Sequence, residues 1–316
     1  MRLITFEDSV RRSRVGALTP DGRVVDLNSA CALYLRDIEN EGAFYRLADA
    51  LVSPHMRELF AGGDTSLEAA RKALDYVLEN DSVTGPRGEP IFYSADEIFM
   101  RAPIVPRKFF HASGFRNVDA IIGHEEPVIY PEHLTQELDG EVELAVVLKK
   151  CGKHFASDDA SSYIGGYVVF NHLTARDIQR REMQSGTSGF CHGIDTFCPL
   201  GPWIVTADEI PDPHQLTMEL RVNGEPRQSS SSSKMAVKIP EILSHYSPMN
   251  YSAGDVLSTS PGAGTFNGDP KARYLKVGDV MECEIEGIGI LRNRIISWEE
   301  AYGHKPAALA TQETSS

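Results

Sequence analysis

The sequence predicts a β-rich α+β protein with two regions, and three observations support this. The chain has 316 residues, about twice the size of a typical domain. Helical spacing of apolar residues is concentrated between positions 30 and 80, whereas short strand-like segments dominate the chain beyond position 101. We therefore expect a small N-terminal α+β domain over residues 1–98, a larger strand-rich domain over 99–302, and a disordered tail over 303–316.

The N-terminal region begins with a predicted β-meander. Its apolar segments are separated by turn signals, the clearest of which is Pro20-Asp21-Gly22. From about Ala30 to Asn80 the apolar residues recur at spacings of three and four, which predicts helices, and Ser66 is a candidate start for the second of them. The strands of the meander are expected at 2–6, 15–18 and 24–25.

The larger region is expected to consist mainly of strands. Asn223-Gly224 predicts a type I′ hairpin, and helical spacing returns only at 177–184 and 235–246. The five serines at 229–233 are expected to form a mobile loop. β-branched and aromatic residues bounded by Gly, Pro, Asn or Asp predict strands at 141–148, 163–170, 203–205, 217–222, 256–258 and 280–286.

Composition excludes several function classes. There are 31 Lys and Arg residues against 45 Asp and Glu residues, giving a net charge of −14 that disfavours nucleic acid and anionic lipid as partners. The apolar runs are much shorter than the roughly 20 residues that span a bilayer, and no signal-like segment opens the chain. Five scattered cysteines without a CxxC pair indicate buried free thiols rather than disulfides or a zinc site. We expect a soluble cytoplasmic protein.

The clearest candidate for chemistry is Glu141-Val142-Glu143-Leu144. In a strand, Glu141 and Glu143 share one face while Val142 and Leu144 share the other. Two carboxylates on one face can hold a hard divalent cation. On spacing alone, a solvated strand face explains the same pattern, so both interpretations stay open at this point.

Further motifs occur together in a fixed order. They include Asn171-His172-Leu173-Thr174-Ala175-Arg176-Asp177-Ile178-Gln179, Asp195-Thr196-Phe197-Cys198-Pro199, Asn223-Gly224 and Gly278-Asp279-Val280. Together with Glu286-Gly287-Ile288-Gly289 they resemble the fumarylacetoacetate hydrolase family through nearly all of residues 101–298. The resemblance implies a mixed β-roll catalytic domain and a homodimer. It also implies a divalent metal, Mg²⁺ or Mn²⁺, chelated by a small 2-oxo acid or 1,3-diketo acid substrate. Members hydrolyse acylpyruvates, decarboxylate oxaloacetate, or tautomerise 2-oxo acids through a metal-stabilised enolate.

The resemblance also assigns residues. It implies that Glu141 and Glu143 are metal ligands, and that Arg176 and Gln179 contact substrate oxygens. His172 occupies the place of the third metal ligand, which is normally Asp. His192 replaces an active-site Lys, and Ser260 keeps a hydroxyl where Thr is usual; we expect both to be catalytic.

Each histidine replacement has alternatives. His172 is either a ligand that shifts the preference toward a softer ion, a pocket residue that does not bind metal, or a packed core residue. His192, with a reference pKa of about 6.5, is either a proton shuttle that titrates near neutral pH or a bystander. His111 and His124 are expected to be loop or surface residues.

A final departure lies between Gly114 and Phe115, which adjoin directly. Relatives carry a lid segment there with a water-activating His and Glu. Either this segment is truly deleted from the protein, or it is only absent from the sequence as printed.

Three functions are therefore considered. The first is a metal-dependent hydrolase, decarboxylase or tautomerase of small 2-oxo acids. The second is a divergent hydratase or lyase using His172 and His192, and the third is an impaired family member.

Overall fold

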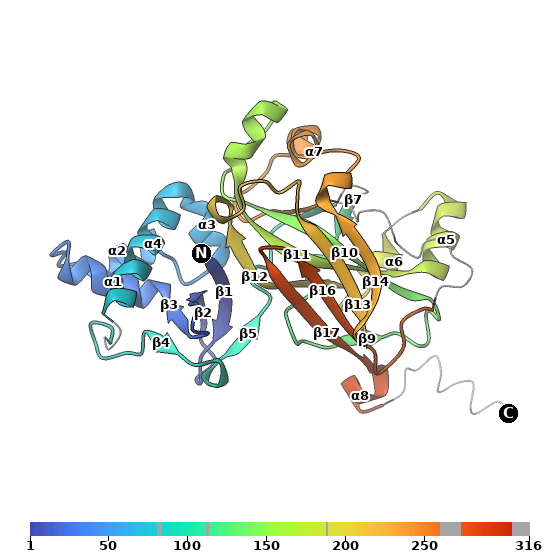
Figure 1. The fold of residues 1–316 in the computed structure, drawn as a ribbon, viewed down its shortest axis with the longest axis horizontal. Helices are drawn as coiled ribbons and strands as arrows, with labels where there is room; N and C mark the ends of the chain where they lie inside the picture. The colour runs from blue at the N-terminus through green and yellow to red at the C-terminus, as the bar shows by residue number, and fades with distance from the viewer. Residues whose placement is uncertain (81–83, 112–113, 188, 260–272, 305–316) are drawn as a thin grey trace.

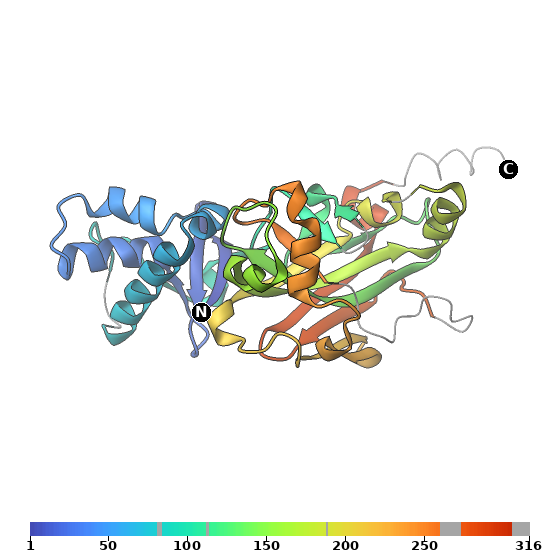
Figure 2. The same ribbon diagram turned by 90° about the horizontal axis from the view of Figure 1, so that it is seen from above.

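The structure is a computed structural model that describes residues 1–80, 84–111, 114–187, 189–259 and 273–304. Figures 1 and 2 show a strand-rich body joined to a smaller region that carries helices α1 to α4. The helices are α1 Leu27–Asp37, α2 Phe44–Leu51, α3 Met56–Ala61, α4 Gly63–Glu79, α5 Arg176–Ser185, α6 Phe190–Gly193, α7 Ile239–Tyr246 and α8 Trp298–Tyr302. The strands are β1 Arg2–Glu7, β2 Ser13–Leu18, β3 Val24–Asp26, β4 Phe92–Tyr93, β5 Phe99–Arg101, β6 Phe109–His111, β7 Gly114–Arg116, β8 Ile121–Ile122, β9 Val128–Tyr130, β10 Leu138–Leu148, β11 Ile164–Ala175, β12 Cys198–Thr206, β13 Thr217–Val222, β14 Glu225–Ser231, β15 Val256–Ser258, β16 Val280–Ile285 and β17 Gly289–Ser297.

The N-terminal region contains the predicted meander. Strands β1, β2 and β3 pair antiparallel in sequence, and α1 follows with the Asp26 side chain accepting from the Ser29 amide as an N-cap. The prediction that Ser66 begins a helix is wrong, because α4 starts at Gly63. Ser66 belongs instead to the buried face of α4, together with Ala70, Ala73 and Val77, at the spacing of three and four that defines one helix face.

One sheet links the two regions. Among the described residues it has 12 strands, with the order β4-β3-β2-β1-β12-β11-β10-β15-β6-β7, while β5 pairs with β1 and β8 with β12. The pairing of β1 with β12 therefore joins the N-terminal meander to the strands of the larger region. The division into domains at residues 98 and 99 stays a prediction.

A second sheet of five strands, in the order β14-β13-β16-β17-β9, packs on the first. Figures 1 and 2 show these two layers. Val142 and Leu144 of β10 point into the core between the sheets, whereas Ala145 and Val147 belong to the core on the opposite face. Every residue of β10 and β11 is buried, so a polar side chain on either strand lies inside the protein.

The hairpin at Asn223-Gly224 is confirmed and is tied to a second motif. Both residues have positive φ, 55° and 81°, as a type I′ turn requires. The Asn223 side chain donates to Asp279 Oδ1 (2.7 Å) and accepts from the Val280 amide (2.9 Å). Two motifs that the sequence placed 55 residues apart thus form one structural unit.

Two predictions about small residues are corrected. Ser229–Ser231 lie in β14 rather than in a loop, because Asn223-Gly224 fixes the register in which this serine run pairs with β13. Ser232 then continues into a 3₁₀ turn and is fully buried. The cysteines are free, but Cys151 is exposed, unlike the other four. Of the predicted tail, residues 305–316 lie outside the described part of the chain.

Candidate active site

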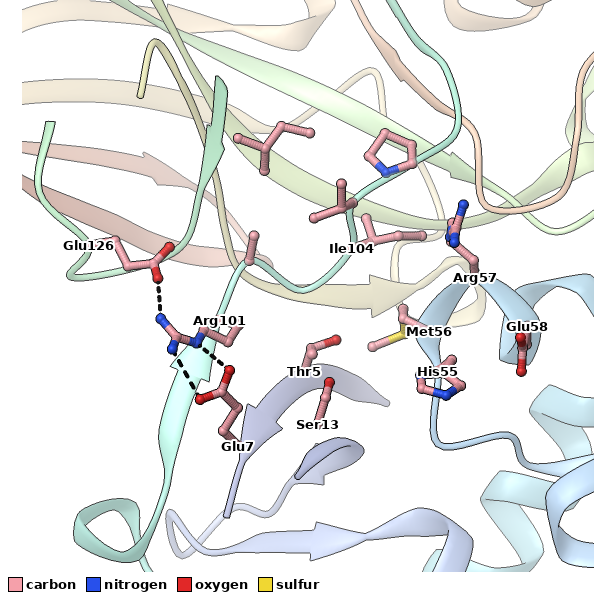
Figure 3. Close-up of a pocket in the computed structure, with 14 residues that line it drawn as sticks. Thr5, Glu7, Ser13, His55, Met56, Arg57, Glu58, Arg101, Ile104 and Glu126 are labelled. Atoms are coloured by element: carbon pink, nitrogen blue, oxygen red, sulfur yellow. Dashed lines mark hydrogen bonds and ion pairs between the residues drawn. The ribbon is translucent and has the colours of Figure 1, made fainter. Parts of the chain in front are cut away.

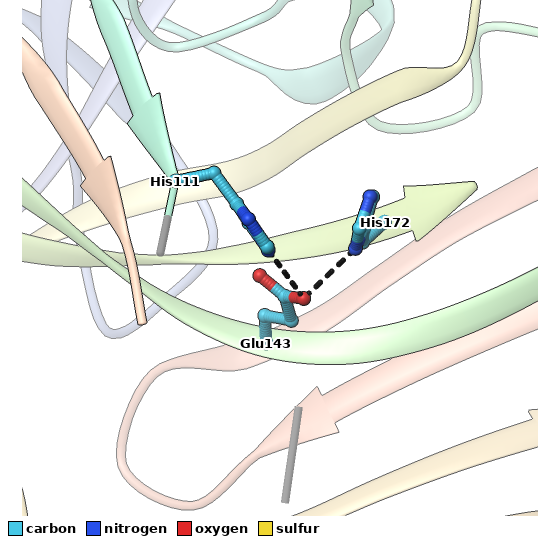
Figure 4. A group of neighbouring side chains, drawn as sticks. All are labelled: His111, Glu143 and His172. Atoms are coloured by element: carbon cyan, nitrogen blue, oxygen red, sulfur yellow. Dashed lines mark hydrogen bonds and ion pairs between the residues drawn. The ribbon is translucent and has the colours of Figure 1, made fainter. Parts of the chain in front are cut away.

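A buried carboxylate lies at the centre of the site. Glu143 on β10 is 0% exposed, and its Oε1 atom accepts from His172 Nδ1 (3.0 Å) and from His111 Nε2 (3.2 Å). Its other oxygen accepts from the Ser258 hydroxyl. Figure 4 shows the two imidazoles approaching Glu143 from different strands. The alternative of a solvated strand face is therefore wrong for the Glu141 and Glu143 pair.

The strand register explains why these side chains meet. Glu141 of β10 is the direct cross-strand partner of His172 on β11, so the two side chains share a face. On the other side of β10, Ser258 of β15 pairs with Ala145, and His111 of β6 pairs in turn with Ser258. The cluster thus spans four neighbouring strands, on the face opposite the five-stranded sheet.

His192 extends this cluster. Its Nδ1 atom lies 3.0 Å from His172 Nε2 and 3.1 Å from the Thr174 hydroxyl. The short helix α6 that carries it is held by Glu182, whose carboxylate accepts from the amides of Phe190 and Cys191. The replacement of the family's Lys therefore places an imidazole directly against a candidate metal ligand.

A second network surrounds Arg176, the first residue of α5. Its guanidinium donates twice to Asp139 Oδ2, at 2.8 Å and 2.6 Å, and also pairs with Glu141 Oε1. Its remaining nitrogen donates to Gln179 Oε1 at 3.1 Å. Arg176, Asp139 and Glu141 are all buried. The two predicted substrate-binding residues are therefore neighbours beside the cluster.

The electrostatics of the cluster are strongly coupled. Burial opposes the charge of Glu143, but the adjacent His111 and His172 outweigh it and hold the pKa of Glu143 well below its usual value. Burial likewise opposes charge on His172, but Glu143 and the hydrogen bonds to both carboxylates raise the pKa of His172. The two carboxylates therefore favour protonation of His172, while Arg176 pairs with Glu141.

His192 behaves in the opposite way. Burial, followed by the charges of His172 and Arg116, lowers the pKa of His192 to about 2. The expectation that His192 titrates near neutral pH is therefore wrong, because burial disfavours the charged ring and the positive charges beside it add to this effect. Its ring is neutral at physiological pH, and such a ring can donate or accept a hydrogen bond but adds no charge.

The structure brings together Glu141, Glu143, His172, Arg176, Gln179 and His192; their functional roles stay predictions. Ser260 lies outside the described residues, whereas Ser258, two positions earlier, contacts Glu143. Asp177, which follows Arg176, accepts a hydrogen bond from the Thr135 hydroxyl.

Three members of the site were missed by the sequence analysis. His111 was expected in a loop or at the surface, but it lies in β6 and is only 4% exposed. Asp139 precedes Glu141 by two positions and so shares its face of β10. The same alternation that paired Glu141 with Glu143 could have predicted it. Arg116 on β7 is a buried cation whose charge opposes protonation of both His172 and His192, although the pKa of His172 is raised overall.

A separate cavity of about 640 Å³ lies between the N-terminal strands, α3 and the segment that follows β5 (Figure 3). Its lining includes Arg101, which is already paired with Glu7 (3.0 Å) and Glu126 (2.7 Å). None of the residues of the Glu143 cluster lines this cavity. We therefore place the chemistry at the Glu143 cluster and assign no ligand to this cavity.

The helices in the described part of the chain include none with the length and apolar character needed to cross a membrane. The cytoplasmic location stays a prediction.

The fold and site together define a strand-rich α+β enzyme with a carboxylate and histidine centre in its main sheet. Residues 94–296 match the family described as fumarylacetoacetate (FAA) hydrolase C-terminal. The chain belongs to the fumarylacetoacetate hydrolase family, a family of enzymes, as the sequence motifs indicated.

Similar proteins agree with this assignment. The chain is 34% identical over 316 residues to oxaloacetate tautomerase Fahd2a, mitochondrial, of Rattus norvegicus, covering 94% of this chain and 92% of that protein. It is 31% identical over 309 residues to oxaloacetate tautomerase YisK of Bacillus subtilis, covering 90% and 96%. The solved structure of fumarylacetoacetate hydrolase from Exiguobacterium antarcticum superposes with a TM-score of 0.71 at 27% identity, covering 94% and 99%. The predicted fold class is confirmed.

Proposed function

We propose that this protein is a divalent-metal-dependent enzyme that interconverts the keto and enol forms of a small 2-oxo dicarboxylic acid of the oxaloacetate type. The observation that carries the proposal is the buried His111, Glu143 and His172 cluster lying beside the Arg176 and Gln179 pair. Two relatives that align with nearly the whole chain are named oxaloacetate tautomerases, which supports this substrate class.

The cluster residues fit a divalent cation. One donor atom from each of His111, Glu143 and His172 lies within 4.8 Å of the others, and all three side chains are buried. Neutral imidazole and carboxylate are ordinary ligands of divalent ions. When bound, such an ion supplies Lewis-acid polarisation of the substrate's 2-oxo group.

The substrate's carboxylate is assigned to Arg176 and Gln179. Two of the guanidinium nitrogens are fixed by Asp139, so the group is held in one orientation before substrate arrives. A planar guanidinium in a fixed position binds a carboxylate with defined geometry. Asp139 and Glu141 are therefore positioning residues for Arg176.

His192 is assigned as a neutral hydrogen-bond donor. Its Nδ1 atom faces the donors His172 Nε2 and Thr174 Oγ1, so the ring proton belongs on Nε2. That N–H stabilises negative charge developing on an enol oxygen, in the place where relatives have a Lys ammonium. A keto–enol shift needs a proton transfer but no activated water.

The absent lid favours this reaction over hydrolysis. Strands β6 and β7 pair directly, with His111 opposite Gly114, and only residues 112 and 113 lie between them. The segment that would supply a water-activating His and Glu is missing from this connection. We therefore expect C–C hydrolysis of acylpyruvates to be the weaker activity.

The test follows the decay of enol oxaloacetate by ultraviolet absorbance, using the chelator-stripped full chain reloaded with ion. The reference is the same ion without protein, because free divalent ions also accelerate enolisation. We expect a rate above that reference that is lost in Arg176→Ala and retained in Arg180→Ala, an exposed arginine on the same helix. No acceleration of oxaloacetate exchange, together with turnover of an acylpyruvate or a 2-oxo-pentenoate, would contradict the proposal and favour the hydrolase or hydratase alternative.

A further inference from the structure

We propose that the ion of this site is held by His111, Glu143 and His172, with Glu141 retained by Arg176, and that this set selects Fe²⁺, Co²⁺ or Zn²⁺ over Mg²⁺. The inference rests on the proposed function only in placing an ion at this cluster. It replaces the ligand set implied by the family resemblance, in which Glu141, Glu143 and His172 bind the metal.

The spacing of the donor atoms is the first support. Glu143 Oε1 lies 3.2 Å from His111 Nε2 and 3.0 Å from His172 Nδ1. Ligands at right angles around an ion, with bonds of about 2.1 Å, are separated by about 3 Å. Glu143 therefore already has the separation of a neighbouring ligand from each histidine, and all three donor atoms lie within 4.8 Å of one another.

The second support is the set of groups behind each donor. Ser258 donates to Glu143 Oε2, which leaves Oε1 facing the two histidines. His172 Nε2 lies 3.0 Å from His192 Nδ1, so the ring can donate from Nε2 and present Nδ1 as a lone pair. Metal-binding histidines usually have such a partner on the second ring nitrogen, which fixes the tautomer and the ring orientation.

Glu141 is engaged elsewhere. Its Oε1 atom pairs with the Arg176 guanidinium, and its Oε2 atom is 3.4 Å from His172 Nδ1, farther than Glu143 is. Glu141 is also outside the group of side chains whose donor atoms lie within 4.8 Å of one another, which consists of His111, Glu143 and His172. His111 therefore replaces Glu141 in the ligand set.

The identity of the donors decides the class of ion. Mg²⁺ prefers six oxygen ligands, and the carboxylate set of the family suits it. Two imidazole nitrogens with one carboxylate suit later first-row ions, whose affinity for nitrogen ligands is greater. This chain gains one nitrogen donor from His172 in place of Asp and a second from His111.

The experiment measures ion binding directly. Chelator-stripped full chain is titrated with CoCl₂ and with MgCl₂ by calorimetry, and the visible absorption of bound Co²⁺ reports nitrogen ligation. We expect Co²⁺ to bind at least 100-fold more tightly than Mg²⁺. His111→Ala should weaken Co²⁺ binding at least 30-fold and change the spectrum, whereas Glu141→Gln should change affinity by less than fivefold.

Two controls keep the result interpretable. His124→Ala removes a half-buried histidine that accepts from the Arg292 amide, outside the cluster, and should leave Co²⁺ binding unchanged. Circular dichroism checks folding, and His111→Gln replaces His111→Ala if the latter is unfolded. Equal Mg²⁺ and Co²⁺ affinities, or loss of Co²⁺ binding in Glu141→Gln but not in the His111 variant, would overturn the inference. Either result would leave the proposed function intact, because that function requires only that a divalent ion binds at the cluster.

Discussion

Replacement of Glu143 by Gln tests whether this carboxylate organises the centre of the site. In the folded chain Glu143 is fully buried and accepts from His111, His172 and Ser258. A hydrogen bond to a charged group contributes about 1.5–3 kcal/mol, against about 0.5–1.5 kcal/mol for a neutral one. The amide weakens three such bonds by about 1 kcal/mol each, and one of its atoms becomes a donor facing a donor.

Loss of the buried charge works in the other direction, because a neutral group is easier to bury. The lowered pKa of Glu143 shows that its partners outweigh the cost of burial. We therefore expect Glu143→Gln to lower the free energy of unfolding of the metal-free protein by about 3 kcal/mol.

The assay is urea unfolding in the presence of chelator, monitored by circular dichroism. The urea midpoints are compared for variants whose unfolding free energy depends equally steeply on urea concentration. Glu125→Gln is the matched control, since Glu125 is 53% exposed and pairs with Arg292 at the surface. Such surface changes stay within about 0.5 kcal/mol. A Glu143→Gln midpoint equal to that of the control would refute the view that Glu143 holds the two histidines.

Three further predictions concern activity and pH. Arg176→Lys should raise the KM for oxaloacetate at least tenfold with a smaller effect on kcat, whereas Arg180→Lys, on the exposed side of the same helix, should leave both near wild type; steady-state kinetics checks this. Because the pKa of His192 is lowered to about 2, the pH–rate profiles of wild type and His192→Asn should have the same shape between about pH 5 and 8 and differ only in the size of the rate. A change of rate with pH in this range that occurs only in wild type would contradict this. The folded-state pKa of Glu143 is lowered, so its contribution to stability is present above 4.5 and lost as the pH falls below 4.5; urea midpoints measured across this window should decline more steeply for wild type than for Glu143→Gln.

Local patterns predicted much of this molecule. The alternation in Glu141-Val142-Glu143-Leu144 assigned opposite faces correctly, and the structure places Val142 and Leu144 in the core between the sheets. Strand segments were also located well, since β-branched runs bounded by turn residues depend only on neighbouring positions. Strand β17, by contrast, was not anticipated as a separate strand.

Non-local pairing explains what the sequence did not reveal. His111 precedes Glu143 by 32 residues and reaches it only because β6 pairs with β15 and β15 pairs with β10. No periodicity in the sequence records such an arrangement. The prediction of a loop for the serine run was wrong for a related reason. Hairpin register and burial outweighed the weak strand preference of Ser.

The neutral state of His192 could not be predicted either. Its reference pKa is a property of an isolated side chain, whereas its actual ionisation depends on burial and on the charges of His172 and Arg116. Those charges come from β11 and β7, which only the folded structure places around α6.

The measurement that tests the central claim most directly is X-ray diffraction from crystals of the full chain grown with Co²⁺ and oxalate, a mimic of an enolised 2-oxo acid. An anomalous difference map locates the ion independently of the protein phases. We predict a peak within about 2.3 Å of His111 Nε2, a Glu143 oxygen and His172 Nδ1, with an oxalate carboxylate reaching Arg176. A Co²⁺ ion and oxalate bound together elsewhere, or no anomalous peak at this cluster, would contradict the assignment of the Glu143 cluster as the catalytic centre.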